Sequence, residues 1–334
     1  MRYFKGQTIL SEVHAIPMPY TVSLITMEEN EALSRQYFPK VRYEIKSEIY
    51  GCCIKLLCDD HTLRDTWEDN FYSMSQNVRS HGRLFVGNDP SYPPDTVLFD
   101  SHAKTAFVFN MRYYGWIKSI ALSLAGDILE DEHSIWSVHG ACLDIGGKGL
   151  CLVGAPGSGK TTQTYGILTN PHTRVISDDW FFFRVYEEDI LAYGSEKNFY
   201  IQEDLATIWK EFGALVPGRT YDSDRRAVTD VRWVIGKGRI LPLTTINTLI
   251  VLKRDPADPN VAQSLNPDTA MNLFLENNYF NPHLLVHNSF KTQVRNRYIG
   301  DLVGRTQCYC VNTTGTPEET QKLIRSLAGV EQTL

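Results

Sequence analysis

The sequence predicts an α/β protein with an α+β tendency, in which a catalytic domain with a mixed sheet follows a β-rich N-terminal region. Three observations support this fold class. An apolar run over 149–153 leads into a glycine-rich loop that ends in Lys160 and Thr161. This pattern is typical of a strand that is followed by a phosphate-binding loop and then by a helix. Up to about residue 110, apolar residues alternate or cluster as they do in strands. Apolar residues at helical spacing then predict a helix over 113–130.

Composition excludes several classes of protein. The chain has 334 residues, of which 43 % are hydrophobic and 22 % are charged, as in soluble globular proteins. No apolar run reaches the ~18 residues that a membrane span needs. Residues 1–7 lack the apolar core of a signal peptide, so we expect a cytoplasmic protein. The net charge of -6 gives no overall electrostatic reason to bind nucleic acid or an anionic membrane. Homo-oligomerisation is left open.

The predicted domain boundary lies just after the helix. We expect residues 1–132 to form a β-rich region with a linking helix, suited to recognising a substrate or a partner, and residues 133–334 to form the catalytic domain. Strands are predicted at 22–25, 44–57 and 105–109, and a loop at 88–95.

A hairpin is predicted directly before the glycine-rich loop. The apolar segments 141–145 and 149–153 flank Gly146 and Gly147, and paired glycines supply the positive φ values of a tight turn. An antiparallel strand therefore precedes the loop, whereas common doubly wound phosphate-binding enzymes lead in with a parallel strand.

The pattern after the loop alternates strands and helices. It predicts a strand at 174–177, a helix at 205–212 capped by Asp204, strands at 228–235 and 246–252, a helix at 268–275 with an aspartate cap, a strand at 308–311 and a last helix at 317–328 with a capping box at Thr316.

The loop fits the pattern G-x-x-x-x-G-K-[ST]. Its glycines permit backbone conformations in which successive N–H groups point at an anion. Lys160 would reach the β- and γ-phosphates of ATP, and the Thr161 hydroxyl would bind Mg²⁺. The predicted nucleotide-binding residues are Gly154, Ala155, Pro156, Gly157, Ser158, Gly159, Lys160, Thr161 and Thr162. A plain glycine-rich turn is the alternative, and the flanking strand and helix favour the phosphate site.

Two adjacent carboxylates, Asp178 and Asp179, follow the next predicted strand. A tight strand, loop, helix and strand unit brings them beside the phosphates. One could hold Mg²⁺, directly or through water, and the other could accept a proton from an attacking hydroxyl. An Asx turn or a helix cap is the structural alternative.

Cations are needed to neutralise charge that develops on a transferring phosphoryl group. Arg225 and Arg226 are the main candidates, followed by Lys237 and Arg239. Each of them alone is more often an ordinary surface cation. Glu203 is either a further metal ligand or a solvated residue at a helix start, and the second alternative is favoured.

The segments 137–145, 154–161 and 175–179 together resemble the catalytic domain of HPr kinase/phosphorylase and its kinase relatives, which shares the phosphoenolpyruvate carboxykinase-like P-loop architecture. The resemblance implies that Lys160 binds phosphates, Thr161 and Asp179 hold the metal, and Asp178 is the general base. It places His139 near the phosphates, although a core histidine is an equal alternative.

The chain departs from the family at two points. The family has a glutamate where this chain has Thr162, and we do not find the family's glycine- and arginine-rich signature. We therefore do not carry over HPr as the substrate or the reverse phosphorolysis reaction.

The sequence thus predicts a kinase that uses ATP and Mg²⁺ and transfers the γ-phosphoryl group to a hydroxyl-bearing substrate. The acceptor is either a protein or peptide serine or a small hydroxylated metabolite. Two alternatives stay open: a nucleotide-dependent switch or NTPase that regulates a partner, and a carboxykinase-like enzyme that acts on a small carboxylic acid.

Overall fold

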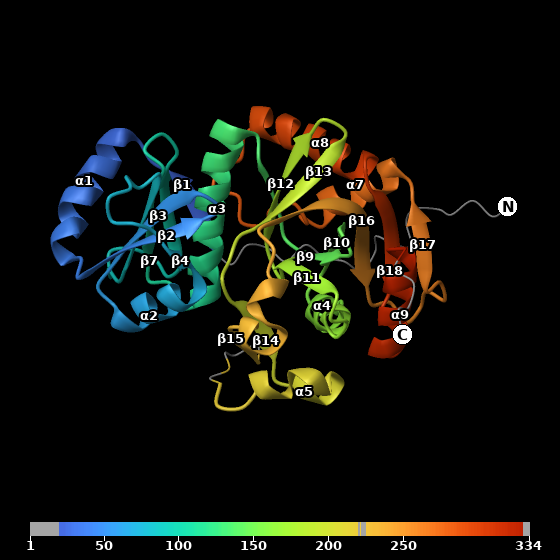
Figure 1. Cartoon of the computed structure of the whole chain (residues 1–334). Helices are drawn as coiled ribbons and strands as arrows, with labels where there is room; N and C mark the ends of the chain where they lie inside the picture. The colour runs from blue at the N-terminus through green and yellow to red at the C-terminus, as the bar shows by residue number, and fades with distance from the viewer. Residues whose placement is uncertain (1–19, 220, 222–224, 330–334) are drawn as a thin grey trace.

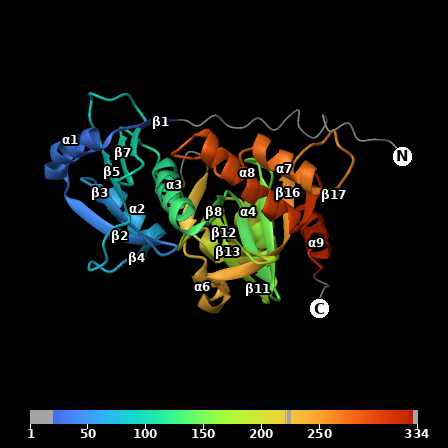
Figure 2. The ribbon, with the colours of Figure 1, turned by 90° about the horizontal axis from the view of Figure 1, so that it is seen from above.

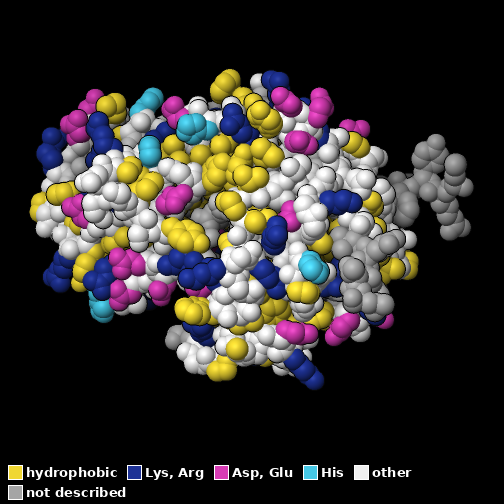
Figure 3. Space-filling model, viewed as in Figure 1, with side chains coloured by type: hydrophobic (Ala, Val, Ile, Leu, Met, Phe, Trp, Pro, Cys, Tyr) yellow, Lys and Arg dark blue, Asp and Glu magenta, His cyan; other side chains and the backbone are white. Residues whose placement is uncertain are grey.

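The computed structural model describes residues 20–219, 221 and 225–329, and the expectation for residues 1–7 lies outside this part of the chain. The fold is mixed α/β, as the sequence predicted, and contains two large sheets (Figure 1). Within the described residues, none of the helices is both long enough and apolar enough to cross a membrane. Acidic and basic side chains are interspersed over the face shown in Figure 3.

The first half of the chain, up to about residue 113, is an α/β layer structure rather than a purely β-rich region. Its sheet has the order β1-β6-β7-β5-β3-β2-β4, and β3, β5 and β7 run parallel to one another. The strands are β1 (Thr21–Leu24), β2 (Tyr43–Ile49), β3 (Cys52–Cys58), β4 (Tyr72–Ser73), β5 (Gly82–Gly87), β6 (Thr96–Asp100) and β7 (Thr105–Phe109).

Helices cover both faces of this first sheet. Helix α1 (Met27–Tyr37) packs Leu33 and Tyr37 on one face. Helices α2 (His61–Asn70) and α3 (Tyr114–His133) pack on the other face. The sequence did not predict α1 and α2, because their buried residues are too few to form a clear apolar stripe.

The second sheet contains nine strands and follows the order β11-β9-β10-β16-β13-β12-β8, with β18 added to β16 and β17 added to β18. These strands are β8 (Trp136–Val138), β9 (Ala141–Ile145), β10 (Lys148–Gly154), β11 (Thr173–Ser177), β12 (Phe181–Tyr186), β13 (Asp189–Gly194), β16 (Leu243–Lys253), β17 (Ala262–Leu265) and β18 (Gln307–Asn312). The predicted hairpin is confirmed: β9 pairs antiparallel with β10, and Gly146 and Gly147 have φ values of 63° and 89°.

Helices also cover both faces of the second sheet. Helices α4 (Lys160–Leu168) and α9 (Pro317–Leu327) share one core with β9 and β10. Helices α7 (Pro267–Glu276) and α8 (Ser289–Gly304) pack on the other face. A small ribbon of β14 (Phe199–Gln202) and β15 (Arg226–Thr229) stands beside the short helices α5 (Leu205–Ile208) and α6 (Arg232–Ile235).

Three sequence predictions in the second half were wrong in detail, and one helix was missed. The strand predicted at 228–235 ends at Thr229, because the Asp230 carboxylate accepts bonds from the backbone and side chain of Arg232 and starts a helical turn. The helix predicted at 205–212 is interrupted at Trp209, with α5 over Leu205–Ile208 and a 3-10 helix over Lys210–Leu215, and Asp204 makes no side-chain cap. Asn266, rather than an aspartate, caps α7. Helix α8 was not predicted, because its apolar residues are sparse.

Helix α3 belongs to the cores of both halves. In Figures 1 and 2 it lies between the two sheets, and its buried cluster contains Leu56 and Leu84 of the first half as well as Trp180 and Phe182 of the second. A Cβ at Gly126 would lie 2.7 Å from the Ser137 hydroxyl, so glycine there lets α3 approach β8 closely. The domain boundary at 132/133 stays a prediction, since the two halves share this helix.

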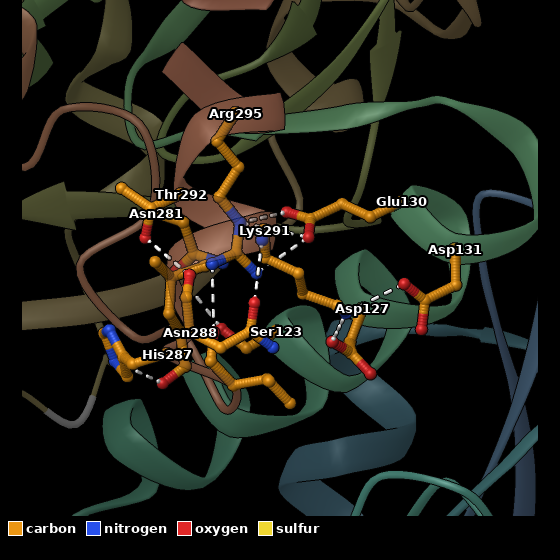
Figure 4. A network of polar contacts seen from close by, with 12 residues as sticks. Ser123, Asp127, Glu130, Asp131, Asn281, His287, Asn288, Lys291, Thr292 and Arg295 are labelled. Atoms are coloured by element: carbon orange, nitrogen blue, oxygen red, sulfur yellow. Dashed lines mark hydrogen bonds and ion pairs between the residues drawn. The ribbon is translucent and has the colours of Figure 1, made fainter.

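A network of ion pairs joins α3 to α8 (Figure 4). The buried Arg295 guanidinium donates to both carboxylate oxygens of Glu130, with Nη2 2.7 Å from Oε2. Nearby, Lys104 and Lys291 both contact the carboxylates of Asp127 and Asp131. These contacts fix α8, which covers the second sheet, to the helix that is shared with the first.

We expect Arg295→Met to lower the free energy of unfolding by about 3–5 kcal/mol, because it leaves the buried Glu130 carboxylate without its partner. Urea unfolding followed by circular dichroism measures the change. Arg297→Met on the exposed side of the same helix is the matched control. Equal stability of the two variants would contradict the assignment of Arg295 as the group that compensates Glu130.

Candidate functional site

Three strand ends place the candidate site at one edge of the second sheet. Strands β10 and β11 run parallel to each other, because each pairs antiparallel with β9, which lies between them. The carboxyl ends of β10 and β11 and the start of β9 therefore meet at the same edge. The glycine-rich loop follows β10, the pair Asp178 and Asp179 follows β11, and His139 lies just before β9.

The glycine-rich loop, residues 154–161, has a conformation suited to a phosphate group. Gly157 and Gly159 have φ values of 79° and 95°, which only glycine adopts without strain. A Cβ at Gly154 would lie 2.5 Å from both the Leu252 carbonyl and the Ser158 hydroxyl. The buried Ser158 hydroxyl has no hydrogen-bond partner among the described residues, as expected of a donor that awaits a ligand.

Lys160 begins α4, and its ammonium donates to the Gly154 carbonyl at 2.5 Å across the mouth of the loop. Burial lowers the pKa of Lys160, while the charge of Asp179 acts to raise it. Thr161 and Thr162 follow in the first turn of α4, and the Thr162 carbonyl accepts a bond from the Trp209 indole at 2.8 Å. Helix α4 thus directs its N-terminus toward the loop.

Asp178 is a buried carboxylate that is only partly satisfied. Its Oδ2 accepts a bond from the Tyr200 backbone N–H at 2.8 Å, whereas its Oδ1 has no partner among the described residues. Burial raises the pKa of Asp178 well above the usual range, and the nearby charges of Asp179 and Glu196 raise it further. Such a carboxylate binds a proton more tightly than an exposed one does.

Asp179 has the opposite character. Its Oδ1 lies 3.3 Å from Nε2 of His139, and its Oδ2 lies 3.1 Å from Nζ of Lys118. Burial acts to raise the pKa of Asp179, but Lys118, His139 and Lys160 outweigh it and hold the pKa well below the usual range. The pKa values of the two adjacent aspartates are therefore shifted in opposite directions, because the carboxylate of Asp179 contacts Lys118 and His139 whereas that of Asp178 contacts a backbone N–H.

Lys118 comes from the first turns of α3, and sequence reasoning did not identify it as a site residue. Its side chain is 2 % exposed, and its ammonium also lies 3.0 Å from the Glu196 carboxylate and 4.3 Å from the centre of the Tyr200 ring. Burial acts to lower the pKa of Lys118, but the surrounding negative charges raise it well above the usual range. Lys118 is therefore a permanent cation inside the site.

The first half contacts the site a second time through α2. The amide of Asn70, the last residue of α2, donates to Glu196 at 3.1 Å. The backbone N–H of Lys197 donates to the Asn70 carbonyl at 2.9 Å. Burial raises the pKa of Glu196, although Lys118 acts to lower it. Glu196 and Asn70 were also missed, because nothing in their local sequence distinguishes them.

The structure separates the two candidate arginines. Arg225 is exposed and pairs with Glu203, so Glu203 binds an arginine here. Arg226 lies on β15 with its guanidinium 5.8 Å from the Tyr200 ring and 5.7 Å from the Tyr113 ring, and it donates to the Tyr113 hydroxyl. Arg226 is therefore the arginine nearer to the carboxylate cluster. Arg239 instead binds the backbone carbonyls of Leu168, Asn170 and Thr173.

His139 lies at the edge, with its imidazole against Asp179 and 6.0 Å from the Trp180 ring. Its backbone N–H donates to the carbonyls of Tyr279 and Phe280. The next residue has to be glycine, because a Cβ at Gly140 would lie 2.6 Å from the Leu152 carbonyl of β10. This close approach brings the imidazole to the edge at which the glycine-rich loop begins.

Metal ligands are scarce at this edge. In residues 20–219, 221 and 225–329, no group of three or more His, Cys, Asp or Glu side chains could hold a metal ion. One oxygen of Asp179 already lies against the Lys118 ammonium and the other against the His139 imidazole. The metal-binding role of Thr161 and Asp179 therefore stays a prediction.

Comparison with known proteins gives little further guidance. No protein-family model matches the chain, and no curated protein matches it. The solved structure of the Hpr(Ser) kinase/phosphatase from Coxiella burnetii aligns with 39 % of this chain and 76 % of its own, at 15 % identity and a TM-score of 0.28. A TM-score this low does not establish a common fold, so the family resemblance stays a prediction and function has to be inferred from the site.

We expect Asp178→Asn to raise the free energy of unfolding near neutral pH. The pKa of Asp178 is raised in the folded protein. The stability that proton binding by Asp178 contributes is therefore fully present below the unfolded pKa of about 3.9, and this contribution is lost as the pH rises through the raised pKa. Asparagine is neutral and keeps an oxygen for the Tyr200 N–H.

Urea unfolding over a pH series measures this effect, with exposed Asp204→Asn as the control. The advantage of Asp178→Asn should grow from acid to neutral pH. A variant whose advantage does not change with pH would show that Asp178 ionises as easily in the folded protein as in the unfolded chain.

Proposed function

We propose that the chain is a phosphotransferase that moves the γ-phosphoryl group of MgATP to a hydroxyl group. The observation that supports this most is the position of Asp178. A buried carboxylate with one unpartnered oxygen lies at the same sheet edge as a glycine-rich loop whose glycines and lysine suit phosphates. A base with a raised pKa beside a phosphate site is what deprotonation of an alcohol requires.

The reaction would proceed in one displacement. The acceptor oxygen attacks the γ-phosphorus while its proton passes to Oδ1 of Asp178, and the bond to the bridging oxygen of ADP breaks. Lys160 turns from the Gly154 carbonyl toward the β- and γ-phosphates. In such reactions the protein contributes mainly positioning and electrostatic stabilisation.

Cations around the site would stabilise the transferring group. Lys160 and the backbone N–H groups of the loop lie on the nucleotide side, and Arg226 lies toward Tyr200 on the side of Asp178. His139 and Asp179 form a pair at the edge, in which Asp179 would bind Mg²⁺ through water while Thr161 supplies its hydroxyl. MgATP enters as the substrate complex.

A nucleotide-dependent switch is the second candidate, because one observation favours it. Lys118 of α3 and Asn70 of α2 connect the first half directly to Asp179 and Glu196. A phosphate that attracted Lys160 and Asp179 would change the charges that Lys118 faces, and the first half could register this change. In a switch of this kind, water would be the only phosphoryl acceptor.

We expect Asp178→Asn to bind MgATP as well as the original protein does but to transfer phosphate at least about a hundredfold more slowly, the contribution of a general base. Nucleotide binding is measured by calorimetry and transfer by release of ADP in the presence of an acceptor. Lys160→Ala should weaken nucleotide binding itself, and exposed Asp204→Asn should change neither property. Full transfer activity in Asp178→Asn would exclude Asp178 as the base.

A further inference from the structure

A cavity of about 170 Å³ lies in the first half at the carboxyl ends of β3, β5 and β7. An enclosed water molecule needs a volume of about 10–15 Å³. The cavity is much larger than this and can therefore hold a small molecule. In open α/β sheets, ligands bind outside the carboxyl ends of parallel strands. The first turns of α2 and α3 form the side walls, through Thr62, Thr66, Tyr114 and Ile117.

The lining contains opposite charges that are not paired with each other. Asp59, which follows β3, and Arg112, which follows β7, both line the cavity. Both side chains are exposed at the rim of the cavity, and within the part of the chain that the structure describes neither makes a side-chain hydrogen bond or an ion pair. The rest of the lining combines hydroxyl groups with the apolar side chains of Met111 and Ile117.

These walls indicate the class of ligand. A simple anion would meet the carboxylates of Asp59 and Asp60, and a metal ion would meet the guanidinium of Arg112. A molecule that has both an ammonium and a carboxylate satisfies Asp59 and Arg112 at once, and a guanidinium binds a carboxylate through two parallel hydrogen bonds. A free α-amino acid has this chemistry, and its side chain would meet the apolar part of the lining.

Both helices that wall the cavity also contact the candidate active site. Helix α2 begins beside the cavity and ends at Asn70, which binds Glu196. In α3, the lining residue Ile117 directly precedes Lys118, which binds Asp179, and the lining residue Tyr114 lies about one turn earlier. The Tyr114 hydroxyl donates to the Thr66 carbonyl at 3.4 Å and so connects the two helices. A ligand that moved either first turn would thus shift Asn70 or Lys118 against the catalytic carboxylates.

We propose that this cavity is an effector site for a free α-amino acid, which Asp59 and Arg112 recognise and whose binding α2 and α3 transmit to Glu196 and Asp179. The binding is independent of the reaction, whereas the regulatory consequence rests on the proposed phosphotransferase function. By thermodynamic linkage, an amino acid that changes the affinity for MgATP has its own affinity changed by the same factor.

Isothermal titration calorimetry of the full chain, without nucleotide, tests the binding directly. The probes are the twenty individual L-amino acids at millimolar concentration, together with inorganic phosphate. We expect saturable binding of at least one amino acid, and at least about tenfold weaker binding of it to Arg112→Met and to Asp59→Asn, since each loses a hydrogen bond to a charged group. Exposed Arg297→Met is the control and should bind normally.

The same titrations repeated at saturating MgATP measure the coupling. The apparent affinity for the amino acid should change in the original protein and change less in Tyr114→Phe, which lacks the bond between α2 and α3. No binding of any amino acid, unchanged binding to both cavity variants, or equally tight phosphate binding would overturn the effector site. Binding that persists in a protein with no phosphotransferase activity would leave this site intact and refute only the proposed function.

Discussion

The candidate site depends on the buried ammonium of Lys118. It lies between Asp179 and Glu196, at 3.1 and 3.0 Å, and is almost fully withdrawn from water. Without it, carboxylates that belong to the second half would face one another in a low-dielectric interior, where like charges are very costly. Because α3 supplies this cation, the second half cannot assemble the same electrostatic environment alone. The shared core around α3 and the Glu130–Arg295 pair hold the helix in the position that this contact requires.

The same cation explains how two neighbouring aspartates acquire different properties. Lys118 and His139 hold the pKa of Asp179 below its usual range, whereas Asp178 faces a backbone N–H and the interior and has a raised pKa. A carboxylate held in this way is unfavourable for folding and useful for proton transfer, as is common where function competes with stability. The cavity at the start of α3 adds a physical route by which the first half could influence this balance.

The sequence predicted the local features of the site but not its long-range contacts. The hairpin from 141 to 153 and the loop at 154–161 follow from glycine positions and apolar runs, which act over a few residues. The position of Asp178 and Asp179 near the loop followed from the short connection between β10 and β11. Lys118, Asn70 and Glu196 could not be found in this way, because they meet only through tertiary packing. A lysine on the otherwise apolar face of the helix predicted at 113–130 was the one available signal.

Phosphoryl transfer to a hydroxyl group is the central claim, and a mass-spectrometric acceptor screen tests it most directly. The full chain is incubated with MgATP and pools of serine-containing peptides and hydroxylated metabolites, with Lys160→Ala in parallel. The account predicts that one component gains a single phosphate in proportion to the ADP formed, and that Lys160→Ala forms no such product. ADP formation accompanied only by inorganic phosphate, whatever acceptor is supplied, would contradict the account and identify a nucleotide-hydrolysing switch instead.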